Sequence, residues 1–196
     1  MGRPVLAFAS AEAWRDWLTE RHASCDGLWL KIGKKGCTGP SVSYAEALDE
    51  ALCHGWIDGQ KRPLDEEHWL QGFSPRRARS KWSKINCAKA EALVQAGRMR
   101  PAGLREMEQA KSDGRWEAAY AGQSTATVPE DLQQALDANP TAAEFFAQLD
   151  KANRYAVLYR VQEPKRAETR AKRIEKFVAM LEKHETIHPA SGGRAS

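Results

Sequence analysis

The side chains best suited to binding chemistry lie in two neighbouring motifs, GWIDG (residues 55–59) and PRRARSKWSK (residues 75–84). Between residues 76 and 105 the chain has one acid, Glu91, against nine basic residues: Arg76, Arg77, Arg79, Lys81, Lys84, Lys89, Arg98, Arg100 and Arg105. Like charges at this density repel one another unless solvent or a ligand relieves the repulsion. The whole chain carries only +4, so the excess is local. We therefore expect an anionic partner for this segment.

The first candidate site consists of His54, Trp56 and Asp58, beside two glycines that permit a tight turn or the close approach of a ligand. In a strand, Trp56 and Asp58 face the same side, so an indole and a carboxylate would line one pocket wall. The structural alternative places Trp56 in the core, uses Asp58 as an acceptor for a turn or for Arg76, and assigns the glycines to the ends of elements.

The basic run forms the second candidate site, because it approaches the start of a predicted helix whose backbone N–H groups also favour phosphate or carboxylate. Trp82 and Phe73 would allow stacking on a base or a sugar. The alternative is a solvated basic surface without a ligand. No helix–turn–helix, RNP or zinc-finger pattern accompanies the run, so sequence-specific DNA reading is not predicted. The two sites give one predicted ligand-binding set: His54, Trp56, Asp58, Arg76, Arg77, Lys81, Trp82 and Asn86.

A third basic surface is expected on the outer face of the last predicted helix, from Lys165, Arg166, Arg170, Lys172, Arg173 and Lys176. Glu168 and Lys172 have the i,i+4 spacing of a helical ion pair. A solvated helix face and a further anion contact both fit this pattern.

Patterns for catalysis or metal binding are weak. The cysteines have no CxxC pairing, which argues against disulfides and structural zinc and favours reduced thiols at Cys25, Cys37, Cys53 and Cys87. His184 and His188 have the i,i+4 spacing of zinc ligands, but Pro189 follows at once and no third ligand is near. No nucleophile elbow, P-loop or dinucleotide fingerprint is present. We predict no catalytic residue, no metal and no cofactor, and an enzyme is unsupported.

Composition indicates a globular protein. A chain of 196 residues fits one domain or two small ones, and 42% hydrophobic residues suffice for a core. No run approaches the roughly 18 apolar residues of a membrane span. The N-terminal stretch enters a helix with Trp14, Arg15, Asp16 and Trp17, which a cleavable secretion signal would not contain. We therefore predict a cytoplasmic location.

Hydrophobic periodicity predicts an α+β fold for the first half. Strands are expected at 27–32, 56–62 and 68–73, and helices at 10–23, 43–54, 80–96 and from Pro101 to before Gly114. Ser43 and Glu46 form a capping box, and Ser80 is the expected N-cap of the third helix. The short connection between the last two strands predicts an antiparallel meander of about three strands.

The second half is predicted to be helical. Helices are expected at 129–139, 141–149, 151–162 and 164–184, the last with an apolar stripe of Ala167, Ala171, Ile174, Phe177, Val178 and Leu181. Residues 114–128 lack a period and are rich in small residues, as a linker or long loop would be. The predicted organisation is an α+β domain at 1–113, this linker, a helical domain at 129–188 and a disordered tail at 189–196.

Four segments carry a family resemblance: EALDEALCHGWIDGQKRPLDE, GFSPRRARSKWSKIN, GRMRPAGL and AETRAKRIEKFVAML. They resemble the bacterial YdeI/OmpD-associated family, also called bacteriocin-protection proteins, from Trp14 to Leu181. The resemblance implies an N-terminal α+β unit similar to the YjbR/CyaY-like group, a helical C-terminal region of the OmpD-associated type, and a link to survival against bacteriocins or cationic peptides. It implies no reaction, cofactor or catalytic residue.

The sequence thus predicts a non-catalytic protein that binds an anionic ligand in a stress or antimicrobial-peptide protection role, the latter from the resemblance alone. Arg76, Arg77 and Lys81 would supply charge, Trp56 and Trp82 an apolar or stacking wall, and Asp58 would orient the basic groups. The alternatives are a sequence-tolerant nucleic-acid binder, and an enzyme whose closed pocket joins His54 and Asp58 to a nucleophile or cofactor. Oligomeric state is not predicted.

Overall fold

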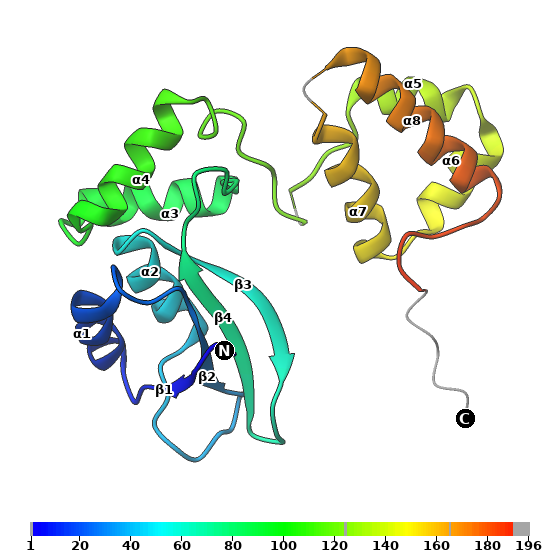
Figure 1. Cartoon of the computed structure of the whole chain (residues 1–196). Helices are drawn as coiled ribbons and strands as arrows, with labels where there is room; N and C mark the ends of the chain where they lie inside the picture. Colours follow the sequence, from blue (N-terminus) through cyan, green and yellow to red (C-terminus); the bar gives the residue numbers. More distant parts are fainter. Residues whose placement is uncertain (1, 124, 165, 190–196) are drawn as a thin grey trace. The chain divides into compact units, whose positions relative to one another are not determined.

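A computed structural model describes residues 2–123, 125–164 and 166–189 (Figure 1). Its contacts divide the chain into two compact units, Met1–Ala119 and Tyr120–Ser196, which we call the N-terminal unit and the C-terminal unit. The division falls inside the segment predicted as a linker, residues 114–128. Of the predicted tail at 189–196, residues 190–196 lie outside the described residues. No helix in the described ranges has the length and apolar character needed to cross a membrane.

The N-terminal unit combines a four-stranded sheet with helices, as the predicted α+β class requires. Its elements are β1 (Val5–Ala7), α1 (Ala11–Arg21), β2 (Leu28–Gly33), α2 (Tyr44–Cys53), β3 (Trp56–Pro63), β4 (His68–Pro75), α3 (Lys84–Gln95) and α4 (Pro101–Ser112). The strand order is β1-β2-β4-β3, and β4 pairs antiparallel with both β2 and β3. The sheet is mixed rather than purely antiparallel, because β1 adds to β2 in parallel. A strand of three residues is too short to show a period in the sequence.

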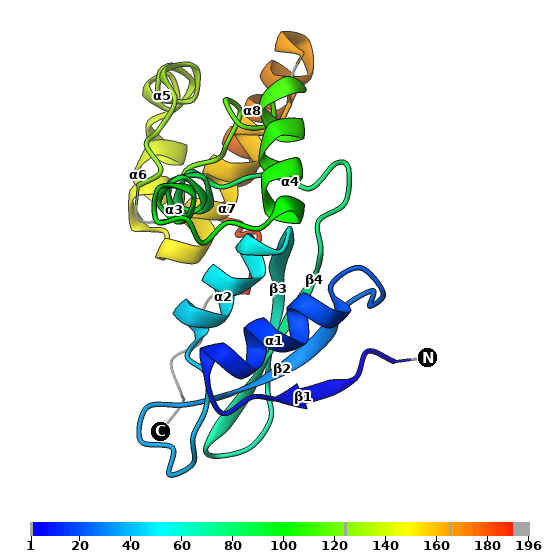
Figure 2. The same ribbon diagram turned by 90° about the vertical axis from the view of Figure 1, so that its left-hand side faces the viewer.

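Helices α1 and α2 cover one face of this sheet (Figures 1 and 2). The expected alternation of β2 is confirmed, since its inward residues Leu28, Leu30 and Ile32 are buried. They pack with Trp14 of α1 and with Ala51 of α2 in one hydrophobic core. The capping box predicted at the start of α2 is also present, with the Ser43 and Glu46 side chains exchanging hydrogen bonds with each other's backbone N–H.

Helix α3 begins later than predicted. Its N-cap is Ser83, whose Oγ accepts a hydrogen bond from the Asn86 N–H at 3.1 Å, whereas Ser80 accepts from the Arg77 N–H at 2.9 Å and closes a turn. Both serines have the residue type of an N-cap, and the sequence alone did not choose between them. Trp82, which lies between the two serines in the sequence, has a buried side chain.

The C-terminal unit contains helices α5 (Glu130–Asp137), α6 (Pro140–Gln148), α7 (Lys151–Gln162) and α8 (Ala167–Glu182). They surround a separate core that includes Leu132, Val157 and Leu181. In α8, Ile174, Phe177 and Leu181 are buried as expected, while Ala167 and Ala171 are exposed. A short alanine side chain on the rim of an apolar stripe buries little area, so little free energy is lost when it faces solvent.

Helix α4 packs closely on the end of α2 at Gly103. A Cβ at this position would lie 2.5 Å from the Cys53 carbonyl oxygen and 2.6 Å from that of Leu52. Backbone atoms cannot move aside as a flexible side chain would. Glycine therefore allows α4 to approach the junction between α2 and GWIDG.

We expect Gly103→Ala to lower the free energy of unfolding by about 1–3 kcal/mol, because overpacking against backbone outweighs the gain of ~1 kcal/mol in helix propensity. Denaturant unfolding followed by tryptophan fluorescence tests this. All seven tryptophans lie in the N-terminal unit, so the signal reports on that unit. Gly39→Ala, where a Cβ has no neighbour within 4 Å, is the control and should change stability by no more than about 0.5 kcal/mol. Equal stability of the two variants would contradict the argument.

Candidate functional site

Residues 76–84, which we call the basic turn, connect the end of β4 to the start of α3. The Arg76 N–H donates to the Gly55 carbonyl oxygen at 3.0 Å, so the turn starts directly on the GWIDG motif. Gly55 has a φ of 74°, a conformation that side-chain-bearing residues rarely adopt. The two motifs singled out in the sequence therefore meet at one end of the β3–β4 hairpin.

The guanidinium of Arg76 is buried, with the residue only 7% exposed. It lies over the Trp82 ring, 3.5 Å from the ring centroid, and Nη1 donates to the Lys81 carbonyl oxygen at 3.3 Å. Its Nε and Nη2 have no hydrogen-bond partner among the described residues. Burial lowers the pKa of Arg76 to about 10, against the opposing effect of the negative charges of Glu106 and Asp58. A buried cation without a paired carboxylate is costly, so its compensation comes from stacking and from charges at longer range.

Arg115 also supports the turn. Its Nη1 donates to the Ser80 carbonyl oxygen at 3.0 Å, while Asp113 holds the same guanidinium in an ion pair. Trp116, the next residue, packs against the Trp82 ring with 4.8 Å between centroids. The backbone of the basic turn is thus fixed by two arginine side chains beneath it.

The exposed charged side chains of the basic turn are all cationic. Arg77, Arg79, Lys81 and Lys84 are all exposed, and Asn86 at the start of α3 is half-buried. No acid occurs in the sequence from residue 76 to residue 90. The turn therefore presents one sign of charge on a fixed backbone.

Both His54 and Trp56 of the first candidate site are buried. Trp56 is buried, and its Nε1 donates to the His22 carbonyl oxygen at 3.1 Å. His54 is buried as well: Nδ1 donates to the Glu50 carbonyl oxygen at 2.9 Å, and Nε2 lies 3.3 Å from the Thr19 hydroxyl. The burial of Trp56 matches the structural alternative, which made no statement about His54.

Asp58 is half-buried and accepts a hydrogen bond from the Tyr44 hydroxyl at 2.9 Å. It acts on Arg76 through charge, and the two residues share no hydrogen bond among the described contacts. The predicted set therefore divides into a buried group, His54, Trp56, Arg76 and Trp82, and a group with access to solvent, Asp58, Arg77, Lys81 and Asn86.

Acids from outside the basic segment neutralise two of its nine basic residues, Lys89 and Arg98. Lys89 pairs with Asp49 at 2.7 Å, and Arg98 pairs with the buried Glu50 at 2.6 Å. Both acids come from α2, some forty residues earlier in the chain, and no local charge pattern reveals such pairs. The positive surface is consequently narrower than the sequence suggested.

The basic face of α8 is largely paired within the C-terminal unit. Arg170 pairs with Asp131, Lys172 with Glu168 and Arg173 with Glu163. This supports the solvated-face alternative, and the i,i+4 ion pair expected from the spacing of Glu168 and Lys172 is present. Lys165 lies outside the described residues.

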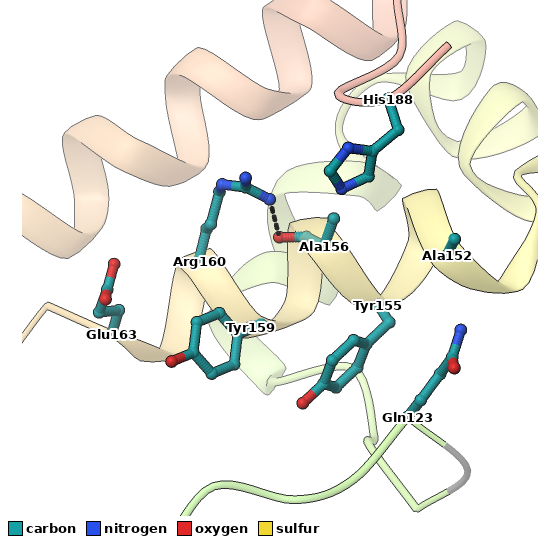
Figure 3. Close-up of a pocket in the computed structure, with 8 residues that line it drawn as sticks. All are labelled: Gln123, Ala152, Tyr155, Ala156, Tyr159, Arg160, Glu163 and His188. Atoms are coloured by element: carbon teal, nitrogen blue, oxygen red, sulfur yellow. Dashed lines mark hydrogen bonds between the residues drawn. The ribbon is translucent and has the colours of Figure 1, made fainter. Parts of the chain in front are cut away.

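A pocket that the sequence did not predict lies along α7 in the C-terminal unit. It has a volume of about 540 Å³ and is lined by Gln123, Ala152, Tyr155, Ala156, Tyr159, Arg160, Glu163 and His188 (Figure 3). The Tyr155 and Tyr159 ring centroids are 6.0 Å apart, and the Tyr155 hydroxyl donates to the Ala121 carbonyl oxygen. The i,i+4 spacing of these tyrosines was the available sequence signal.

Comparisons with known proteins match the two units separately. Residues 6–106, slightly more than half of the chain, match a family described as "Domain of unknown function (DUF8412)". Residues 125–184 match the family described as "Bacteriocin-protection, YdeI or OmpD-Associated". No curated protein and no solved structure matches the chain. The second match supports the predicted family resemblance for the helical region, while the YjbR/CyaY-like character of the first unit stays a prediction.

The burial of His54 generates a pH prediction. Burial lowers the pKa of His54, so the folded protein takes up this proton at a lower pH than the unfolded chain, whose histidine is protonated below about pH 6.5. Stability should therefore fall as the pH drops through that value, by at most ~1.4 kcal/mol per pH unit for this residue.

Urea unfolding at about pH 7.5 and about pH 5, followed by tryptophan fluorescence, tests this sign. His54→Gln should lose less stability on acidification than the unaltered protein. His184→Gln removes a histidine from the C-terminal unit. It should lose as much stability between about pH 7.5 and about pH 5 as the unaltered protein. An identical acid response in all three proteins would contradict the role assigned to burial.

Proposed function

The chain belongs to the family described as a domain of unknown function (DUF8412), and we propose that it is a non-catalytic binding protein whose basic turn holds an anionic ligand. At the level of the family, the match of residues 125–184 suggests a bacteriocin-protection-like role. The stress or antimicrobial-peptide protection role of this chain is part of the proposal, and a cytoplasmic location remains a prediction.

The observation that carries the proposal is the exposure of four cations on a backbone fixed from below. Arg76 and Arg115 bond to carbonyl oxygens within the turn, at Lys81 and Ser80. Binding to a fixed backbone costs less conformational entropy than binding to a mobile loop. Arg77 and Lys81 are the predicted site residues that can contact an anion directly, whereas Arg76 supplies positive charge from beneath and holds the turn.

The alternative of a sequence-tolerant nucleic-acid binder uses the same cations, because phosphates of a backbone and those of a small ligand attract them equally. The burial of both Trp56 and Trp82 removes the two indoles that would have stacked on bases. This favours a small anion over a polynucleotide. An enzyme joining His54 to a nucleophile is disfavoured, since the described contacts of His54 are made within the core.

We expect Arg77→Ala/Lys81→Ala to weaken anion binding by about tenfold, because each exposed charge contact contributes up to ~1 kcal/mol. Pyrophosphate by calorimetry and a labelled single-stranded oligonucleotide by fluorescence anisotropy are the two probes. Lys35→Ala/Lys61→Ala, which removes two exposed charges nearer the opposite end of the sheet, is the matched control and should bind normally.

The dependence on salt separates the two ligand classes. For the oligonucleotide, the logarithm of affinity should fall with the logarithm of salt by ~0.7 per neutralised phosphate, and the double variant should lose about 1.4 of that slope. Pyrophosphate binding without oligonucleotide binding supports the small-anion proposal, and the reverse supports the alternative. If neither probe binds and native mass spectrometry finds no co-purifying anion, the proposal is overturned.

The pocket along α7 is a second candidate site for the same ligand chemistry. Arg160 would supply charge and the rings of Tyr155 and Tyr159 an aromatic wall, which suits an anion with an aromatic or apolar portion. Its position within the unit that matches the bacteriocin-protection family favours it.

Arg160→Gln assigns the ligand to one site or the other. Adenosine triphosphate, which joins phosphates to an aromatic base, is the probe for binding in this pocket. Binding that falls in Arg160→Gln but not in Arg77→Ala/Lys81→Ala would place the ligand in the pocket, and we expect a loss of about tenfold for a lost charge-assisted hydrogen bond. Unchanged binding in Arg160→Gln would remove the pocket from consideration.

A further inference from the structure

We propose that Cys37, Glu67 and His68 form a site for a divalent transition metal, with zinc as the best-matched ion. The proposal concerns the N-terminal unit at the β3–β4 turn, the end of the hairpin away from the basic turn. It does not depend on the anion-binding function, because none of its residues belongs to either candidate site above.

The three potential ligands converge from two segments of the chain. Cys37 lies in the loop between β2 and α2, whereas Glu67 and His68 lie where β4 begins. Figures 1 and 2 show that loop at the same end of the sheet as the β3–β4 turn. One ligand atom from each residue, the sulfur, an imidazole nitrogen and a carboxylate oxygen, lie within 4.8 Å of one another.

The Cys37–His68 geometry is already close to that of a shared ion. Cys37 Sγ lies 3.3 Å from His68 Nε2. Tetrahedral zinc with typical bond lengths holds a sulfur and a nitrogen about 3.6 Å apart, so a shift of a few tenths of an ångström would admit it. Glu67 is exposed, and its Oε1 accepts a hydrogen bond from the exposed Thr38 hydroxyl at 3.2 Å, so its carboxylate would turn from a solvent-exposed contact to reach the ion. A water would complete four-coordination.

The hydrogen bonds around the His68 ring also suit a histidine that coordinates a metal ion. Its Nδ1 lies 2.9 Å from Asp65 Oδ1, which orients the ring with Nε2 toward the sulfur. A carboxylate on the far nitrogen of a ligating histidine fixes the tautomer and raises the basicity of the ligand. The same Asp65 oxygen accepts from the backbone N–H groups of Glu67 and His68, so the carboxylate is itself held in place.

The backbone brings the cysteine to this position. The Lys34 N–H donates to the Glu67 carbonyl oxygen at 2.7 Å, and the Cys37 N–H donates to the Lys34 carbonyl oxygen at 3.0 Å. A Cβ at Gly33 would lie 3.1 Å from the Cys37 sulfur, so the absence of a side chain there lets the cysteine approach. The segments are therefore joined before any ion binds, which reduces the ordering cost of binding.

The two buried cysteines do not offer a competing thiolate site. Burial raises the pKa of Cys53 and of Cys87 to about 11, so both remain thiols near neutral pH. In the part of the chain that the structure covers, the Cys37 group is the set of three potential ligands within reach of one ion. Cys25, which is half-buried like Cys37, serves as the matched control.

Cobalt(II) titration of the reduced full-length protein tests the site, because cobalt replaces zinc and reports its ligands through absorption. We expect a thiolate-to-cobalt charge-transfer band and the visible bands of tetrahedral cobalt, both removed by added zinc. Cys37→Ser should abolish the charge-transfer band, and Cys25→Ser should retain it. Absence of the band in the unaltered protein, or its persistence in Cys37→Ser, would overturn the proposal.

Two further variants address the remaining ligand and the outer carboxylate. Glu67→Gln, at an exposed position that should not affect folding, should keep the charge-transfer band and bind cobalt at least tenfold more weakly. Asp65→Asn keeps an oxygen for the backbone N–H groups and should weaken binding by about 10–100-fold. Unchanged cobalt affinity in both variants would overturn the assignment, and tryptophan fluorescence confirms that each variant is folded.

Discussion

The burial of one guanidinium organises the N-terminal unit around its two sequence motifs. Arg76 reaches the Gly55 carbonyl through its backbone N–H, the Lys81 carbonyl through Nη1 and the Trp82 ring through its flat face. A lysine could not reproduce this arrangement, because its point charge lacks the planar fork and stacks less well. The exposed cations of the basic turn keep their position only while this buried contact is kept.

Local pattern predicted the elements well where it was strong. The alternation in β2 and the Ser43 capping box each depend on residues a few positions apart, and both are present. Prediction failed where a choice depended on distant partners. Ser83 rather than Ser80 caps α3, since Arg115 and Arg77 hold Ser80 in the turn. The parallel strand β1 forms through its pairing with β2. Its three residues are too few to show a hydrophobic period in the sequence.

The residue types of the candidate site were predictable, but which of them are buried or paired with distant residues was not. Sequence indicated which residues concentrate charge, yet Trp56 and Trp82 lie in the core and Arg98 is paired with Glu50, 48 residues earlier. The proximity of Cys37 to His68 crosses 31 residues in the same way. Such contacts follow from strand register and loop path, which set distances that spacing along the chain does not encode.

Two closed cores within one chain have an evolutionary meaning. One hydrophobic cluster includes Trp14 and Leu30, and a different one includes Leu132, Val157 and Leu181. The two clusters share no buried residue among the described residues. Two different families match the chain, one over residues 6–106 and the other over residues 125–184, so the boundary between the matches falls in the same region as the boundary between the units. Recombination could join either half to a new neighbour without rebuilding an interior.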